Sequence, residues 1–223
     1  MTLVTVRPAV VVAMVTVVVA AASLLGAPTS PGSVSRGAGL SSVVLKASQV
    51  GPGYRLKMRE DSHCVQLCVT LDLCGFDFTS EADRTARLQV DYVKSRKELG
   101  LSNEVVRYRP GGTALAIREL NRAVTTCPRG PVASTVAGVG PLTYRIHRFT
   151  ASHLLPGAVA LRMTVSGTAK GHHFKVKTVA IYQVHGLLLS GVYASVLAGS
   201  DVTPALNFAV HAARASAANL SRS

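Results

Sequence analysis

Acidic residues are scarce in this sequence, which has 11 Asp and Glu against 24 Lys and Arg and a formal net charge of +13. The N-terminal segment contributes little to this excess, because Arg7 is the one charged residue before Arg36. An excess of positive charge favours contact with anionic partners, and it also favours solubility without any partner. Charge therefore indicates a class of partner and does not identify one.

The signature motifs of several enzyme classes are also missing. The sequence has no H-E-x-x-H, no G-x-S-x-G and no G-x-x-x-x-G-K-[ST], and residues 138–143 lack the third glycine of a dinucleotide-binding loop. His172 and His173 are adjacent, so in a strand they point to opposite faces and do not bind one metal ion together. We expect no metal and no cofactor, and we expect a non-catalytic protein, with a secreted hydrolase on the same scaffold as the alternative.

Acidic side chains gather in one stretch of the chain, at Asp72, Asp77, Glu81 and Asp83. A catalytic pair of carboxyl groups requires a cleft that raises one pKa, whereas a polar turn beside a disulfide has no such requirement. The sequence favours the polar turn. Asn103 and Glu104 follow a loop serine, and we expect them to close a turn and start a strand.

The N-terminus has the layout of a secretory signal. Arg7 precedes an apolar run over residues 8–27 that ends in small residues, and cleavage after Ala22 or Ala27 suits this pattern. The run is also long enough for an uncleaved membrane anchor, which is the alternative. We expect residues 1–27 to direct export, residues 28–40 to form a Pro/Gly/Ser-rich flexible leader, and residues 41–219 to form a single domain.

Three of the four cysteines lie within residues 64–75, which read CVQLCVTLDLCG. They lack the paired C-x-x-C spacing of zinc and redox sites, and export favours disulfide bonds. In one regular strand Cys64 and Cys68 would lie about 13 Å apart, too far to bond, so a bond between them requires a turn. Cys127 needs a partner from the cluster, and we favour Cys74.

Hydrophobic periodicity predicts both helices and strands in the first half of the mature chain. Residues 41–50 are expected to form a helix, 54–60 a strand and 113–127 a longer helix with Leu115, Leu120 and Val124 facing the core and Glu119 facing solvent. Residues 86–93 alternate and predict a half-buried strand. Its two faces are an apolar one, with Ala86, Leu88, Val90 and Tyr92, and a polar one, with Arg87, Gln89 and Asp91.

The second half is expected to be mainly β-structure. Strands within residues 142–150, 158–169, 174–186 and 187–196 are separated by short turns, which predicts an antiparallel meander. Val176 and Ile181 have opposite strand parity, so both can be buried only with a bulge or with cover on both faces. Thr203 is expected to cap a final helix with an apolar stripe of Leu206, Val210 and Ala213. The fold class is α+β, a largely antiparallel β-sheet flanked by helices.

Four stretches of this sequence resemble a known family. They are VGPGYRL (50–56), the segment 101–128 that ends in TTCP, LPGAVALRMTV (155–165) and VAIYQVHGLLLSGVYA (179–194). The sequence resembles, over residues 41–215, the secreted sensor-domain proteins of actinobacteria, which are similar to the PknH-like extracellular domain of receptor Ser/Thr kinases. The resemblance implies a two- or three-layer, disulfide-stapled sandwich of the Mog1/PsbP-like type with a ligand-binding cleft. Residues 1–223 include no kinase domain, so the resemblance does not imply a signalling output.

Basic residues recur at alternating positions of the predicted second-half strands, at Arg145, His147, Arg162, Lys175 and Lys177. Alternation places several of them on one sheet face. Tyr144, Arg145, Arg162, Lys175 and Lys177 are the ligand-binding candidates. We expect a small or anionic ligand of the cell envelope, or a membrane or wall surface, and no nucleic acid, because the sequence has no basic and aromatic stacking pattern. Either N-terminal alternative places the domain outside the cytoplasm.

Overall fold

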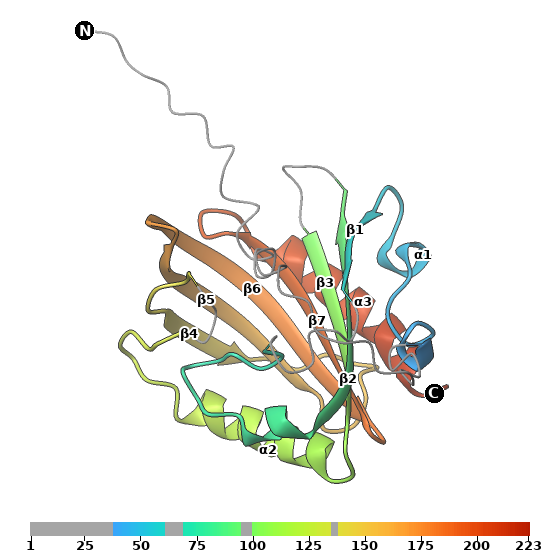
Figure 1. Cartoon of the computed structure of the whole chain (residues 1–223). Helices are drawn as coiled ribbons and strands as arrows, with labels where there is room; N and C mark the ends of the chain where they lie inside the picture. The colour runs from blue at the N-terminus through green and yellow to red at the C-terminus, as the bar shows by residue number, and fades with distance from the viewer. Residues whose placement is uncertain (1–37, 61–68, 95–99, 135–137) are drawn as a thin grey trace, which may run out of the picture.

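Seven strands form one antiparallel sheet in the order β1-β2-β3-β7-β6-β5-β4 (Figure 1). The structure is a computed structural model that describes residues 38–60, 69–94, 100–134 and 138–223. The strands are β1 (Arg55–Glu60), β2 (Arg84–Val93), β3 (Gly100–Tyr108), β4 (Thr143–Arg148), β5 (Val159–Ala169), β6 (His172–His185) and β7 (Leu188–Leu197). Several predicted features lie outside the described residues: the signal segment or the anchor that is its alternative, most of the leader, Cys64 and Cys68.

Helices cover both faces of the sheet, which gives the molecule three layers (Figure 1). α3 (Thr203–Leu220) packs against β6 and β7 on one face. α2 (Gly112–Thr125) lies on the other face, next to η3 (Thr79–Asp83). The short elements η1 (Ala38–Leu40) and α1 (Ala47–Val50) lie on the α3 side, where Leu40, assigned to the leader by sequence, is fully buried.

The predicted meander of the second half is confirmed. Strands β4 to β7 pair in sequence order, and the pairing of β6 with β5 and with β7 runs without a shift. Ile181 packs in the core on the α3 side, whereas its neighbours Ala180 and Tyr182 pack in the core on the α2 side. Val176 is buried with the parity of Ala180. Cover on both faces, rather than a bulge, therefore explains how Val176 and Ile181 are both buried.

Small side chains bring α3 close to the sheet. The fully buried residues of its inner side are mostly alanines, namely Ala205, Ala209, Ala212 and Ala213, with Leu220 at the end. Leu206 and Val210, expected in the buried stripe, are only partly buried. Thr203 is also not the cap that was expected, because it is the first residue of the helix and its N–H and Oγ1 bond to Oδ1 of Asp201.

Buried amides fasten α3 to the layers beneath it. Gln183 of β6 donates from Nε2 to the carbonyl of Ala213, and Asn219 donates from Nδ2 to the carbonyl of Val43, at 2.9 and 3.1 Å. On β3, Asn103 accepts the N–H of Leu45 and donates to Ser190. The expectation that Asn103 closes a turn is therefore wrong, because it lies in the middle of a strand as a fully buried amide.

The side chain of Glu119, expected to face solvent, and the polar face of β2 are both buried on the α2 side. Glu119 accepts hydrogen bonds from the backbone of Thr79 and Ser80 at 3.0 Å, so this carboxylate caps η3 from the side. Arg87 and Asp91 of β2 are only 4% and 3% exposed. Sequence periodicity identifies the two faces of β2 correctly, but it does not show that the polar face is buried with a charged partner, Glu104 of β3.

A disulfide joins Cys74 to Cys127, the pairing favoured from the sequence, with the two Cα atoms 5.1 Å apart. It fastens the segment that precedes η3 to the chain just after α2. Cys74 is buried in the same core cluster as Leu120 and Ala123 of α2. Among the described helices, none is long and apolar enough to cross a membrane.

Candidate functional site

Register places most of the basic candidates on one face of β4, β5 and β6. Arg145 is opposite Thr164, and Thr164 is opposite Lys177, so these three residues form a row across three strands. Ala160 and Ile181 pack beneath α3. Because side chains alternate, residues an even number of positions away on the same strand share that face. The basic side chains are Arg145, His147, Arg162, His173, Lys175 and Lys177, and we call this surface the basic face.

The basic face begins where the cover of α3 ends. Val179 is fully buried, whereas Arg162, its partner on β5, is exposed. Arg145 and Lys175 are also exposed, and Lys177 is half-buried. Continuous pairing of β4, β5 and β6 thus fixes the positions of these cations, and α3 does not cover them.

The cations of the basic face have few acidic neighbours. Within the described residues, Arg145, Arg162, Lys175 and Lys177 make no salt bridge. The Nζ atom of Lys177 donates instead to the carbonyl of Ser200 at 2.8 Å. The adjacent Asp201 carboxylate is already occupied by hydrogen bonds from Thr203, which with the charge of Lys177 hold its pKa below the ordinary value. The positive charge is therefore not neutralised by ion pairs within the described fold.

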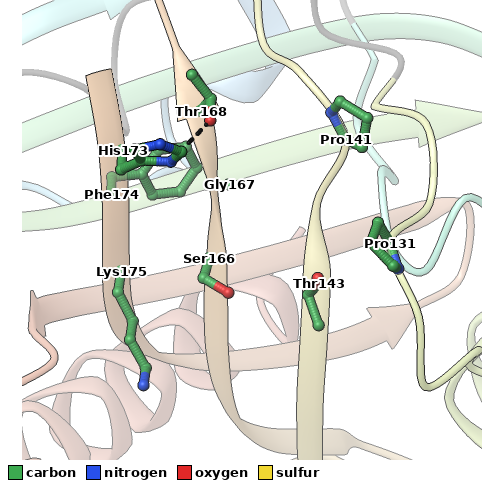
Figure 2. A pocket seen from close by; sticks show the side chains of 9 residues that line it. All are labelled: Pro131, Pro141, Thr143, Ser166, Gly167, Thr168, His173, Phe174 and Lys175. Carbon is green, nitrogen blue, oxygen red and sulfur yellow. Dashed lines mark hydrogen bonds between the residues drawn. The ribbon is translucent and has the colours of Figure 1, made fainter. Parts of the chain in front are cut away.

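A shallow hollow of about 640 Å³ adjoins one end of the basic face (Figure 2). Thr143, Ser166 and Lys175 form a row across the three strands beside it, and Thr168 is hydrogen-bonded to Nδ1 of His173 at 3.0 Å. The remaining lining residues are apolar or small: Pro131, Pro141, Gly167 and Phe174. Three hydroxyl groups and a lysine side chain therefore line the hollow together with two prolines.

Tyr144 is not part of this site. It precedes Arg145 on β4 and therefore points to the opposite face, where it is buried in the core on the α2 side. Burial is the largest cause of the raised pKa of its hydroxyl group. Tyr92, Tyr108 and Tyr182 are also buried.

A second polar cluster was not recognised in the sequence. Arg87 of β2 forms an ion pair with Glu104 of β3, and both side chains are nearly inaccessible to solvent. Thr70 donates to the same carboxylate at 2.9 Å and accepts from Arg84 at 2.9 Å. Gln89 continues the chain of bonds to Asp91 at 3.1 Å. The alternation along 86–93 was the one feature of the sequence that could have indicated this cluster. Polar residues at every second position of a strand share a face, and on a buried face they can form a network of hydrogen bonds.

The acidic stretch around Cys74 does not form a joint site. Asp72 accepts from Ser134 at 3.1 Å, Asp83 lies 3.9 Å from Arg109, and Asp77 is exposed. Glu81 bonds the N–H groups of Thr70 and Leu71, and burial raises its pKa even though Arg84 is adjacent. Within the described ranges, no three His, Cys, Asp or Glu side chains are grouped as metal ligands would be.

The expected likeness to PknH-like extracellular domains is confirmed at the level of the fold. The structure is similar to the crystal structure of the extracellular domain of PknH from Mycobacterium tuberculosis, with a TM-score of 0.52. The match covers 79% of this chain and 93% of that chain at 12% sequence identity. No protein-family model matches the sequence, and no curated protein matches it. This chain therefore has the α+β architecture of that extracellular domain.

Proposed function

We propose that this protein is an extracytoplasmic, non-catalytic binding domain of the sensor type, and that the basic face receives an anionic ligand of the cell envelope. One observation carries the proposal. Arg145, Arg162, Lys175 and Lys177 share one open sheet face, with no described carboxylate paired to them and with a hydroxyl-lined hollow beside them.

The compartment is supported by three independent features. The Cys74–Cys127 disulfide is typical of oxidising compartments outside the cytoplasm. The N-terminal sequence has the composition of an export signal. The fold is that of a domain whose crystal structure is described as extracellular. Outside the cell, a positively charged face meets phosphorylated wall components and lipid headgroups rather than nucleic acid.

Charge complementarity decides which ligand class suits the basic face. An array of unpaired cations attracts anions over about 8 Å at physiological ionic strength, and the attraction weakens as salt is added. Rigid strands position the cations in advance, so binding does not require the surrounding backbone to become ordered. The adjoining hollow distinguishes this surface from a uniformly charged one, because it offers hydroxyl donors at a fixed place.

The proposal is tested with inorganic polyphosphate as the probe, by isothermal titration calorimetry at several salt concentrations. A variant with Arg145, Arg162, Lys175 and Lys177 changed to Gln is compared with a control in which four exposed cations elsewhere, Lys57, Lys94, Arg118 and Arg122, are changed to Gln. Both variants lose the same charge. We expect the first to lose binding and the control to retain most of it. Equal losses would attribute binding to net charge alone and would contradict the proposal.

A further inference from the structure

The middle strand of the basic face carries short hydroxyl side chains, and the side chains beside them on β6 are longer and basic. Thr164, Ser166 and Thr168 follow one another at alternate positions of β5. On the β6 side they are flanked by Lys177, Lys175 and His173, in the same rows. We call this line of three hydroxyl groups the hydroxyl gutter.

The gutter has one rim on each side and a charged end. Arg145 of β4 is opposite Thr164, and Thr143 is opposite Ser166, so β4 supplies the second rim. Arg162 precedes Thr164 by two residues on β5 and lies at the point where α3 begins to cover the sheet. The opposite end opens into the hollow beside Thr168 and His173 (Figure 2). A linear ligand can therefore enter from the hollow and end at a guanidinium group.

From this arrangement we propose that the gutter binds a linear phosphodiester chain whose phosphates are joined by a short polyol. Hydroxyl groups two residues apart on a strand are spaced by about 6.6 Å, since each residue advances the strand by about 3.3 Å. Phosphates joined through a short polyol have a similar separation, whereas those of inorganic polyphosphate lie much closer together. A phosphate over Thr164 or Ser166 would accept a hydrogen bond from that hydroxyl and face a cation of β6 or β4. The phosphate at the other end would lie beside the Thr168–His173 pair.

The described surface favours such a chain over the other anionic partners. The large exposed apolar side chains of the described residues, Leu56, Val69, Leu187 and Leu197, include none from the basic face, so the face has no group that would insert into a bilayer. The three gutter residues carry no ring, and the nearby rings of His173 and Phe174 lie at the hollow end alone, so the gutter lacks the succession of stacking side chains that is usual in single-strand binding. The proposal rests on the proposed function, because it names the anionic ligand of the same face.

The test measures the affinity of synthetic glycerol phosphate oligomers of increasing length by fluorescence anisotropy. The line from Thr168 to Arg162 spans six residues, about 20 Å, so affinity should rise until the chain has about four phosphates and then level off. We expect the four-phosphate oligomer to bind at least about tenfold more tightly than the single glycerol phosphate, since several charge-assisted hydrogen bonds are added. Equal affinity for the two lengths would overturn the gutter.

A variant that fills the gutter separates shape from charge. Changing Thr164 and Ser166 to Ile removes two hydroxyl groups and adds bulk while the net charge stays the same, and Ile is well suited to strands. We expect a loss of about tenfold or more for the four-phosphate oligomer, at an unchanged melting temperature, and no loss for the control Thr150→Ile outside the gutter. Unchanged binding by the filled variant would overturn the proposal.

The failure of this inference can be distinguished from failure of the proposed function. If the fourfold Gln variant loses polyphosphate binding while oligomer length and gutter filling have no effect, the basic face binds anions without a linear chain in the gutter. The protein could instead bind vesicles that contain anionic phospholipid, or oligodeoxythymidylate with four phosphates, more tightly than the four-phosphate glycerol phosphate oligomer. Either result would overturn the proposal in favour of that partner.

Discussion

Arg87 of β2 donates from Nε to Oε1 of Glu104 on β3, and the two side chains are only 5% and 6% exposed. The same oxygen also accepts from Thr70 at 2.9 Å. Removing one member of a buried ion pair leaves an uncompensated charge, which typically costs about 3–5 kcal/mol. We expect Glu104→Ala to lower the free energy of unfolding by this amount in urea denaturation.

The paired substitution Arg87→Met with Glu104→Leu is the control for that prediction. It removes both charges and refills the space with apolar atoms, so it should destabilise the protein less than Glu104→Ala alone. If the single and double variants are equally unstable, the pair is not the unit that stabilises this part of the sheet.

Acid should weaken the cap that Glu119 provides to η3. Burial works to raise the pKa of Glu119, but hydrogen bonds from Ser80 and Thr79 outweigh it, and the net pKa is below the ordinary value. A folded pKa below the unfolded one gives stability that is present above the unfolded pKa and is lost as pH falls through the folded pKa. Between pH 7 and pH 3, Glu119→Gln should therefore lose less stability than the wild type, as measured by thermal melts.

Glu81 provides a control of opposite sign. Its pKa is raised, chiefly by burial, so the folded state takes up a proton more readily than the unfolded state. Acidification through the raised pKa therefore favours folding at this site. Over the same pH range, Glu81→Gln should lose stability more steeply than the wild type, and identical slopes in the two variants would contradict both assignments.

The Cys74–Cys127 bond closes a long loop, with 53 residues of sequence separation. In the chain-entropy model, a loop of that length corresponds to about 4 kcal/mol of stabilisation. Replacing both cysteines by Ala should lower the free energy of unfolding by about 2–5 kcal/mol. Tryptic digestion without reduction should yield one linked peptide pair with Cys74 and Cys127, and thiol titration of the unfolded, unreduced chain should find no free thiol.

Gly191 of β7 makes room for an aromatic pair on the α2 side. A Cβ atom at this position would lie 2.7 Å from Cζ of Tyr193, whose ring is held edge-to-face against Tyr182 at 5.6 Å. Overpacking of this kind typically costs about 1–3 kcal/mol. We expect Gly191→Ala to destabilise the fold by that amount in urea denaturation, and to do so much less when Tyr193 is also changed to Leu.

Periodicity was sufficient to predict most of the architecture. The alternation in 86–93 and the turns between the second-half strands predicted β2 and the meander, because a two-residue period directly reflects side-chain direction. The first helix was overestimated: residues 41–50 contain only the short α1, since Val43, Val44 and Leu45 are buried in the non-helical residues that precede it. Apolar composition predicted their burial but not their backbone.

The candidate site was predictable in part, because the two-residue period of a strand shows which side chains share a face. Alternate positions on consecutive antiparallel strands share a face, so Arg145, Lys175 and Lys177 could be grouped without coordinates. The exposure of these side chains to solvent could not be predicted, because it depends on how far α3 extends across the sheet. The buried pair of Arg87 and Glu104 was also beyond sequence reasoning, since burial of a charge depends on a partner from another strand.

The most direct test of the anion-binding account is hydrogen–deuterium exchange of the full chain with and without inorganic polyphosphate. The account predicts slower exchange in residues 143–148, 162–168 and 173–177, which form the basic face, and no change in β1 or in α2. The fourfold Gln variant should show no such protection. Protection confined to the β1–β2 side of the sheet, or to α2, would place the ligand elsewhere and would contradict the central claim.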